Sequence, residues 1–202
     1  MFSRSKKREG VELPPGQSLI PNILRWGIDH PGITPSLPHV AKENWHLDID
    51  GEVERPLSLG WPEIMALPQT ESVSDFHCVE GWSVLVQRWR GVRFRYLQET
   101  AGARLTARFA LLSCADGYTT SLPFSELQGD NVLLAHALNG EDLPQPLGGP
   151  LRLIVPQKYA YKSAMWLNRI TFSAEDRLGF WERGYYSNTA DVWADDRFRK
   201  GR

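Results

Sequence analysis

A cysteine at the end of a run of strand-forming residues is the first feature of this sequence that can do chemistry. Cys78 stands in segment 75–82, Asp-Phe-His-Cys-Val-Glu-Gly-Trp, where an expected strand gives way to a glycine-containing turn. Functional side chains gather at strand ends, and a thiolate there can act as a nucleophile or as a soft metal ligand. Adjacent strand residues point to opposite faces, which disfavours a direct hydrogen bond between His77 and Cys78. Taken alone, each side chain is more often a packed core residue than a ligand.

A pair of glycines followed by an arginine forms a second candidate site. Gly148 and Gly149 precede Pro150, and Arg152 lies in the apolar segment 151–155. Backbone NH groups around paired glycines can face an anion, and a neighbouring arginine can bind phosphate through two nitrogens. A Gly-Pro turn that leads into a buried strand is the alternative, and the residues alone favour it somewhat.

A third candidate lies in segment 158–167, which contains Lys162, Ser163 and Ala164. The lysine offers a positive charge and the serine a hydrogen-bond donor, both beside a small residue. A solvated loop has the same composition, so this segment alone does not indicate a ligand.

Several common kinds of site lack the patterns that they need. The sequence has no CxxC pair or HExxH helix for zinc and no GxGxxG or Walker loop for nucleotides. The net charge of -1 gives no support to a nucleic-acid partner. No apolar run is long enough for a membrane span, no secretory signal is present, and the chain has 2 cysteines. We therefore expect a cytoplasmic protein with free thiols.

Apolar alternation and turn residues predict a chain that is mostly β. Residues 45–50 and 53–59 flank Asp50-Gly51, which predicts a hairpin. Pro62 and Pro68 bound a short helix expected over 61–67. Further strands are expected over 72–77, 109–114, 132–138, 151–155 and 166–172, and further short helices over 94–99 and 124–127.

These elements must position the candidate residues within an α+β fold, mostly β, built as a curled mixed sheet or barrel with short helices. The length of 202 residues fits one domain. We expect a disordered basic tail over residues 1–10 and a single domain over 11–202. Within that domain, residues 11–38 are expected to form an extended arm, and residues 180–198 an irregular aromatic cover over the core.

The three candidate segments, in this order, resemble the sulfite oxidase family of molybdopterin-binding oxidoreductases. Three segments carry the resemblance. The first surrounds Cys78, the second is Leu-Pro-x-x-x-Gly-Gly-Pro-Leu-Arg-Leu-Ile-Val-Pro and ends at Pro156, and the third is Tyr-Lys-Ser-Ala-x-Trp-Leu over residues 161–167. It spans roughly residues 12–200 and points to small stand-alone members that lack a haem domain. The resemblance implies a molybdopterin-binding fold and a molybdenum enzyme.

The same resemblance assigns roles to individual residues. Cys78 corresponds to the molybdenum ligand and is a catalytic candidate. The segments that grip the pterin and its phosphate imply cofactor contacts at His77, Gly148, Gly149, Arg152, Lys162, Ser163 and Ala164. Asn22 and Arg25 resemble a family loop that closes over the cofactor. Cys114 lies near a cofactor-contacting position, with strand packing as the alternative, and Tyr118 is a second catalytic candidate that is expected to line the pocket.

Some residues depart from the family pattern. The chain has Leu147 where members commonly place His or Asn, and Met165 where they place Lys, so two polar contacts to the cofactor are missing. The Cys-x-Gly-Asn-Arg-Arg pattern of true sulfite oxidases is also absent. A doubly charged sulfite would need those basic residues, so sulfite is the weaker substrate candidate.

The implied function is two-electron oxygen-atom transfer on a small-molecule substrate, with molybdenum and molybdopterin (Mo-MPT) as cofactors. Because no CxxCH haem motif occurs, an external protein or carrier is expected to donate or accept electrons. Sulfoxide-reductase-like and sulfite-oxidase-like activity both stay open. Leu147 and Met165 also leave open a cofactor-free binding or scaffold protein that retains the fold, and Cys78 leaves open a metal-free thiol enzyme.

Overall fold

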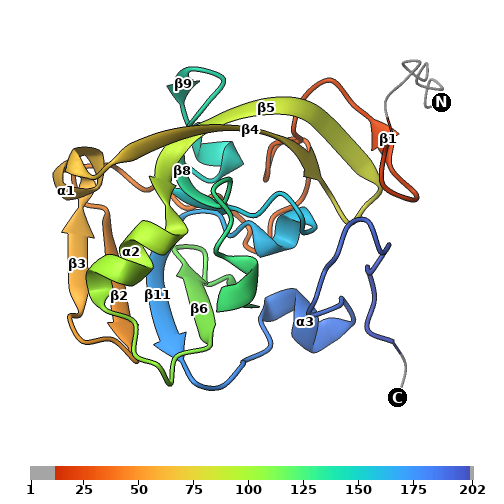
Figure 1. Ribbon diagram of the computed structural model, residues 1–202. Coiled ribbons are helices and arrows are strands. Elements are labelled where there is room, and N and C mark those ends of the chain that lie inside the picture. Colours follow the sequence, from red (N-terminus) through yellow and green to blue (C-terminus); the bar gives the residue numbers. More distant parts are fainter. Residues whose placement is uncertain (1–11, 201–202) are drawn as a thin grey trace.

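Two open β-sheets with short helices around them make up the structure, a computed structural model that describes residues 12–200 (Figure 1). In the larger sheet, β1, β5, β8 and β10 lie side by side, β4 pairs with β5, and β9 pairs with β8. Its strands are β1 (Ser18–Leu19), β4 (Gln69–His77), β5 (Trp82–Arg93), β8 (Leu133–Leu138), β9 (Glu141–Asp142) and β10 (Arg152–Ile154). The antiparallel β4–β5 hairpin arches across the molecule, and its turn carries Cys78.

The second sheet has the order β3-β2-β11-β6-β7. Its strands are β2 (His46–Gly51), β3 (Leu57–Gly60), β6 (Phe109–Cys114), β7 (Thr119–Pro123) and β11 (Leu167–Ser173). Strand β11 runs parallel to β2 and antiparallel to β6. It therefore joins the early β2–β3 hairpin to the β6–β7 hairpin within one sheet.

Short helices connect the strands and cover the edges of the sheets. They are α1 (Trp61–Ala66), α2 (Phe94–Ala101), α3 (Phe180–Gly184) and the 3-10 turns η1 (Phe124–Glu126), η2 (Gln145–Leu147) and η3 (Ala160–Lys162). Helix α2 buries Phe94, Leu97 and Ala101 and ends at Gly102, whose φ of 65° suits a left-handed cap. Within the described residues, no helix is long and apolar enough to cross a membrane.

The largest hydrophobic core joins side chains from both sheets. Leu47 and Ile49 of β2, Ile170 of β11, Leu134 of β8 and Leu153 of β10 belong to it and are almost fully buried. Each such side chain contributes about 1.5–3 kcal/mol when it leaves water. The two sheets are thus held together by one shared core, and the site is built along the border of the larger sheet.

The structure confirms the mostly β, mixed α+β class and corrects several details. The sheets stay open, so the described residues form no closed barrel. The second strand of the first hairpin begins at Leu57, because Val53 instead forms an isolated bridge with Ala103. Strands β5 and β7 were not predicted. In β5, Val86 takes a positive φ of 56° and the pairing register shifts between Ser74 and Phe76, so a regular alternation never develops.

The two ends of the chain were expected to be irregular. The proposed tail over residues 1–10 lies outside the described residues. The described part of the arm adds the short β1 to the large sheet, parallel to β5, and a bridge between Trp26 and His30. The cover over 180–198 begins with helix α3 and supplies part of the wall of the cavity described next.

Candidate functional site

Cys78 lies in the four-residue turn between β4 and β5. The Cys78 backbone NH donates to the Trp82 carbonyl at 2.9 Å, and the Gly81 NH donates to the Cys78 carbonyl at 3.0 Å. Gly81 has a φ of 95°, a region that glycine enters without steric cost. The turn therefore leaves the sheet tightly and presents the thiol at the end of the hairpin.

A chain of hydrogen bonds behind the turn explains the position of His77. The Ser83 hydroxyl donates to Gln17 Oε1 at 2.9 Å, and Gln17 Nε2 donates to the Cys78 carbonyl at 3.1 Å. Because the single hydroxyl proton of Ser83 is used in this way, His77 Nδ1 must donate to Ser83 Oγ, at 2.7 Å. Burial lowers the pKa of His77, which favours this neutral form. His77 lies outside the cavity lining and supports the turn from behind.

A cavity of about 480 Å³ opens beside the turn. Five predicted site residues line it, namely Cys78, Tyr118, Arg152, Ser163 and Ala164. They come from the β4–β5 turn, the β6–β7 hairpin, β10 and the segment after η3. The structure therefore brings together residues that are far apart in the sequence, at the place where the strands end.

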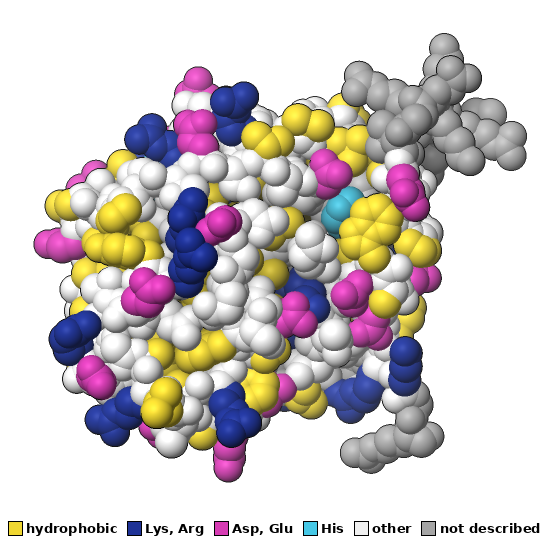
Figure 2. Space-filling view, viewed as in Figure 1, with side chains coloured by type: hydrophobic (Ala, Val, Ile, Leu, Met, Phe, Trp, Pro, Cys, Tyr) yellow, Lys and Arg dark blue, Asp and Glu magenta, His cyan; other side chains and the backbone are white. Residues whose placement is uncertain are grey.

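The wall of the cavity is largely aromatic and apolar. Aromatic side chains from the arm, the hairpin and the α3 segment contribute, namely Trp26, Phe76, Trp82, Phe180, Trp181, Tyr185 and Tyr186. Trp26 stacks on His30 with ring centroids 4.7 Å apart. In Figure 2, hydrophobic side chains gather at the right of the face beside a histidine, with Asp and Glu side chains around them. Sequence reasoning missed this wall, although the dense aromatics over 180–198 were a signal for it.

Arg152 is a buried cation with no counter-ion among the residues that the structure describes. The side chain donates to the Leu147 carbonyl at 2.7 Å and to the Ser163 carbonyl at 2.9 Å, and its guanidinium lies 5.0 Å from the Phe76 ring. Within residues 12–200 it has no carboxylate partner, and its Nε has no hydrogen-bond partner. Burial lowers the pKa of Arg152 to about 9. A desolvated arginine of this kind is stabilised by an anion that enters the cavity.

The Cys78 thiol faces a carboxylate. Burial, followed by the nearby Glu80 charge, raises the pKa of Cys78 to about 12. Glu80 Oε2 lies 3.8 Å from the sulfur and also accepts from Trp82 Nε1 at 3.2 Å. The same oxygen pairs with His30 Nε2 at 2.5 Å. Sequence reasoning did not single out Glu80 or His30, both of which line the cavity.

Tyr118 lines the cavity as predicted, and its hydroxyl already has a partner. It donates to the Tyr161 carbonyl at 2.7 Å, and burial raises the pKa of the phenol well above its ordinary value. Asp116, in the same hairpin turn, also lines the cavity and accepts the Tyr118 backbone NH at 3.0 Å. Burial raises the pKa of Asp116 as well. Burial thus makes a negative charge on either group less favourable than it would be in water.

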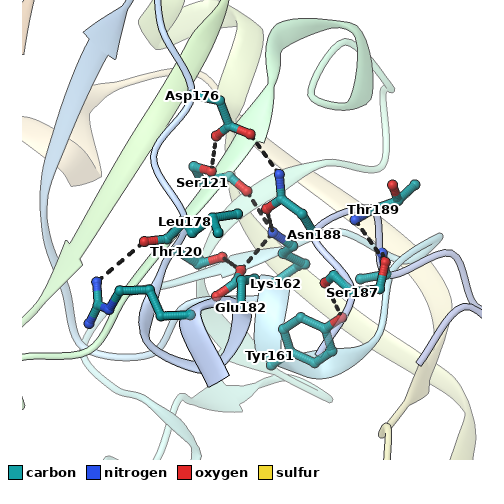
Figure 3. Close-up of polar contacts among 12 residues, drawn as sticks. Thr120, Ser121, Tyr161, Lys162, Asp176, Leu178, Glu182, Ser187, Asn188 and Thr189 are labelled. Carbon is teal, nitrogen blue, oxygen red and sulfur yellow. Dashed lines mark hydrogen bonds and ion pairs between the residues drawn. The ribbon is translucent and has the colours of Figure 1, made fainter. Parts of the chain in front are cut away.

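Lys162 lies outside the cavity lining, inside a buried polar cluster (Figure 3). Its Nζ donates to Glu182 Oε1 at 2.6 Å, to the Ser121 carbonyl at 2.9 Å and to Asn188 Oδ1 at 3.1 Å. The side chains of Lys162 and Glu182 are both 0% exposed. Asp176 completes the cluster by accepting from Asn188 Nδ2 at 2.6 Å. The charge of Lys162 is thus satisfied within the protein, and a contact with the cofactor stays a prediction.

Gly148 and Gly149, whose backbone NH groups were predicted to face an anion, are enclosed by protein. A Cβ on Gly148 would lie 2.7 Å from the Met165 side chain, and a Cβ on Gly149 would lie 2.1 Å from the Leu143 carbonyl. Both residues are buried and lie outside the cavity lining. Close packing of protein on protein therefore accounts for the missing side chains. The two departures from the family pattern, Leu147 and Met165, do line the cavity.

The remaining predicted contacts also lie outside the lining. Asn22 and Arg25 are exposed, and Arg25 pairs with Asp29 at 2.8 Å, while Ile23 and Leu24 between them face the cavity. Cys114 is 5% exposed and belongs to the main core. For this cysteine the structure shows the strand packing that was its alternative.

The fold and the cavity define a domain that can hold an anionic cofactor beside a free thiol. The chain belongs to the family described as oxidoreductase molybdopterin binding domain, whose model matches residues 34–181. It is an oxidoreductase, and the cofactor of its family is molybdopterin with molybdenum. The predicted membership of the sulfite oxidase family is confirmed.

Relatives support this membership. The chain is 38% identical over 186 residues to the uncharacterized oxidoreductase YuiH of Bacillus subtilis, covering 92% of this chain and 91% of that protein. It is 33% identical over 169 residues to the protein-methionine-sulfoxide reductase catalytic subunit MsrP of Campylobacter jejuni, covering 72% of this chain and 57% of MsrP. Thus the chain spans nearly the full length of the first relative and little more than half of the second.

A solved structure shows the same fold. The sulfane dehydrogenase SoxCD of Paracoccus pantotrophus superposes with a TM-score of 0.68 and 23% identity, over 81% of this chain and 46% of that chain. At this identity the match concerns the fold alone. It agrees with the two-sheet architecture described above.

Proposed function

We propose that this protein carries out molybdopterin-dependent, two-electron oxygen-atom transfer on a small substrate, with the Cys78 thiolate as a ligand of molybdenum. The observation that carries the proposal is the shared cavity of Cys78 and Arg152. A soft thiol and a buried arginine without a counter-ion are the two groups that a metal dithiolene with a phosphate needs.

The donor set fits the cofactor. The unpartnered Nε and the two carbonyl-bound nitrogens of Arg152 mark a place where negative charge is missing. Ser163 and Ala164 line the same wall. Ser163 Oγ accepts the Val155 backbone NH at 3.1 Å, which fixes its side chain. Arg152 would hold anionic oxygens of the cofactor, and Cys78 would hold the metal.

When bound, molybdenum supplies two-electron redox chemistry and exchange of an oxygen atom. The chain's own residues orient and shield the reacting centre. The β4–β5 turn fixes the thiol, and the aromatic wall formed by Trp26, Trp82 and Trp181 excludes water from it. In the reducing direction an oxide consumes two electrons and two protons and releases its oxygen as water. In the reverse direction the substrate takes its oxygen from water and releases two electrons and two protons.

The wall favours a neutral oxide, such as a sulfoxide, over the sulfite dianion. Glu80 and Asp116 line the cavity, whereas Arg152, which is 2% exposed, is assigned to the cofactor. Carboxylates beside apolar rings repel a doubly negative substrate, and no basic residues follow Cys78 in the turn. The name of MsrP, a protein-methionine-sulfoxide reductase, points in the same direction.

Electron supply and location complete the proposal. An external protein or small carrier would deliver or remove the electrons, because the sequence has no CxxCH haem motif. The expected location is the cytoplasm, where Cys78 and Cys114 stay reduced. The raised pKa of Cys78 disfavours the metal-free thiol enzyme, which needs a thiolate near neutral pH.

Metal analysis of protein from a host that makes the cofactor tests the proposal. We expect molybdenum and pterin close to one per chain in the parent protein and a large loss of both in Cys78→Ser. The control Cys114→Ala removes the other thiol, which lies in the core, and should keep the metal. A parent protein without molybdenum or pterin would support the cofactor-free scaffold that Leu147 and Met165 left open. Full metal content together with retained turnover in Cys78→Ser would refute the ligand assignment.

A further inference from the structure

Segments from both halves of the sequence meet at the Cys78 turn. Arg197 donates through one terminal nitrogen to the Val79 carbonyl at 3.2 Å and through the other to the Pro15 carbonyl at 3.0 Å. The β4–β5 turn, the N-terminal arm and the C-terminal segment are therefore bridged by one guanidinium. Its side chain is 17% exposed, so these bonds are largely shielded from water.

Two other carbonyls of the turn also accept hydrogen bonds. The Cys78 carbonyl accepts from Gln17 at 3.1 Å, and the Gly81 carbonyl accepts from the Ser18 backbone NH at 2.8 Å. Arg197 is the group that holds the carbonyl of Val79, the residue after the cysteine. A hydrogen bond from a charged donor is stronger than one from a neutral donor. Arg197 thus adds a charged restraint to the residue that follows Cys78 in the turn.

Arg197 occupies space that is free because Gly16 and Gly81 have no side chains. Gly16 has a φ of 67°, and a Cβ there would lie 2.2 Å from a terminal nitrogen of Arg197. Gly81 has a φ of 95°, and a Cβ there would lie 3.0 Å from the Gly16 carbonyl and 3.6 Å from Arg197. A side chain at Gly16 would therefore displace the guanidinium. Glycines in the arm and in the turn thus allow both segments to pack closely against the guanidinium.

Arg197 is itself fixed before it reaches the turn. Its Nε donates to Asp195 Oδ1 at 2.7 Å, and the same oxygen accepts from the Tyr159 hydroxyl at 3.1 Å. The guanidinium also lies 5.7 Å from the centre of the Tyr159 ring. These contacts orient the planar guanidinium so that two carbonyls can be bound at once. A lysine in its place has a single nitrogen to share among these acceptors.

We infer that Arg197 is a positioning residue that fixes the direction of the Cys78 thiol toward the cavity, and so the geometry of the metal–sulfur bond. The inference rests on the proposed function, because it concerns the same sulfur. Arg197 does not line the cavity, so it acts through the Val79 carbonyl and not on the substrate.

The first experiment measures alkylation of Cys78 by iodoacetamide in the full chain purified without cofactor, with peptide mapping to separate Cys78 from Cys114. Arg197→Ala should raise the Cys78 rate by about tenfold or more, because the turn loses a charge-assisted bond. Arg197→Lys should restore part of the protection. The control Arg199→Ala also affects the C-terminal segment, since the Arg199 side chain donates to the Glu182 carbonyl, but it leaves the turn untouched.

The second experiment compares the electron paramagnetic resonance spectrum of Mo(V) in the loaded proteins. We expect shifted g values in Arg197→Ala, a partial return in Arg197→Lys and an unchanged spectrum in Arg199→Ala. If Arg197→Ala does not fold, Gly16→Ala replaces it, with Gly140→Ala as the matched control. Gly140 has a positive φ of 92° and nothing within 4 Å of an added Cβ, so both variants carry backbone strain and only Gly16→Ala displaces Arg197.

Each result separates the two proposals. Parent-like alkylation in Arg197→Ala, or equal acceleration in Arg199→Ala, would overturn the positioning role. In the glycine pair, equal rates for Gly16→Ala and Gly140→Ala would do the same. A parent chain without molybdenum would refute the proposed function instead, while the alkylation series would still decide whether Arg197 restrains the thiol.

Discussion

Arg152, which lines the cavity, and Lys162, which lies next to lining residues, are both buried basic residues, yet their partners differ. Lys162 has a carboxylate, a carbonyl and an amide oxygen around its Nζ. Arg152 has two carbonyls, aromatic rings and a free Nε, with no carboxylate among residues 12–200. Removing one partner of a buried ion pair leaves an uncompensated charge, whereas a buried cation without a carboxylate gains from an anion that binds beside it. From this difference we expect Lys162 to matter most for stability and Arg152 to matter most for cofactor binding.

The largest effect is expected at the lysine. Lys162→Met leaves the fully buried Glu182 without its cation, which should lower the free energy of unfolding by about 3–5 kcal/mol. Urea denaturation of cofactor-free protein measures this loss. The double variant Lys162→Met with Glu182→Gln removes the stranded charge and should recover at least about 1 kcal/mol. A loss below about 1 kcal/mol in the single variant would show that the buried pair does not hold the fold.

Cofactor loading should have the next largest effect, and it acts on the arginine side of the comparison. An anion bound at Arg152 stabilises the folded state, by about 3 kcal/mol at a hundredfold excess over Kd. This corresponds to a rise in Tm of about 6–12 °C for a domain of this size. Thermal unfolding of loaded and cofactor-free protein checks it. Equal Tm values despite bound molybdenum would contradict it.

Arg152→Met sharpens the contrast by separating stability from binding. Without cofactor, the lost bonds to Leu147 and Ser163 are offset by removal of a desolvated charge, so we expect a change in unfolding free energy within about 2 kcal/mol. Molybdenum per chain should fall at least about tenfold in protein from a cofactor-making host. Stability loss as large as in Lys162→Met, with normal metal content, would reverse the assignment of the two residues.

The smallest effect is expected at Asp116 and depends on pH. Its folded pKa is raised, so its charged form costs stability once the pH rises above its unfolded value of about 4. Asp116→Asn removes this cost and should be more stable than the parent at pH 7 by less than about 1 kcal/mol. The advantage should vanish below about pH 3, where both states of the parent are protonated. Denaturation at the two pH values measures it, and a variant less stable at pH 7 would be evidence against a desolvated carboxylate.

Much of the fold was predictable because its strands have recognisable burial patterns and end at turn residues. Strands β2, β6 and β11 alternate between more and less buried residues, β8 is a continuous buried run, and the structure confirms all four. Strand β5 was missed because Val86, with its positive φ, interrupts the alternation where Asp75 accepts its backbone NH at 2.8 Å. Such a bulge depends on the partner strand, which a local pattern cannot show.

The part of the site that was predictable consists of residues whose position follows from the local sequence. Cys78 and Arg152 line the cavity because a turn and a strand end carry them there. The pairing of Lys162 with Glu182 was not predictable, because the carboxylate is 20 positions away on a helix that packs against the strand β7. The aromatic wall was missed for the same reason, since Trp26 and Tyr186 meet only through tertiary packing.

The bond between Arg197 and Val79 has a consequence for the order of assembly during translation. The two residues are 118 positions apart, so the ribosome completes the cysteine hairpin long before it adds the arginine. A nascent chain that stops before residue 197 would leave the Val79 carbonyl without its Arg197 donor. Metal insertion after synthesis of residue 197 would meet a turn that already has this restraint.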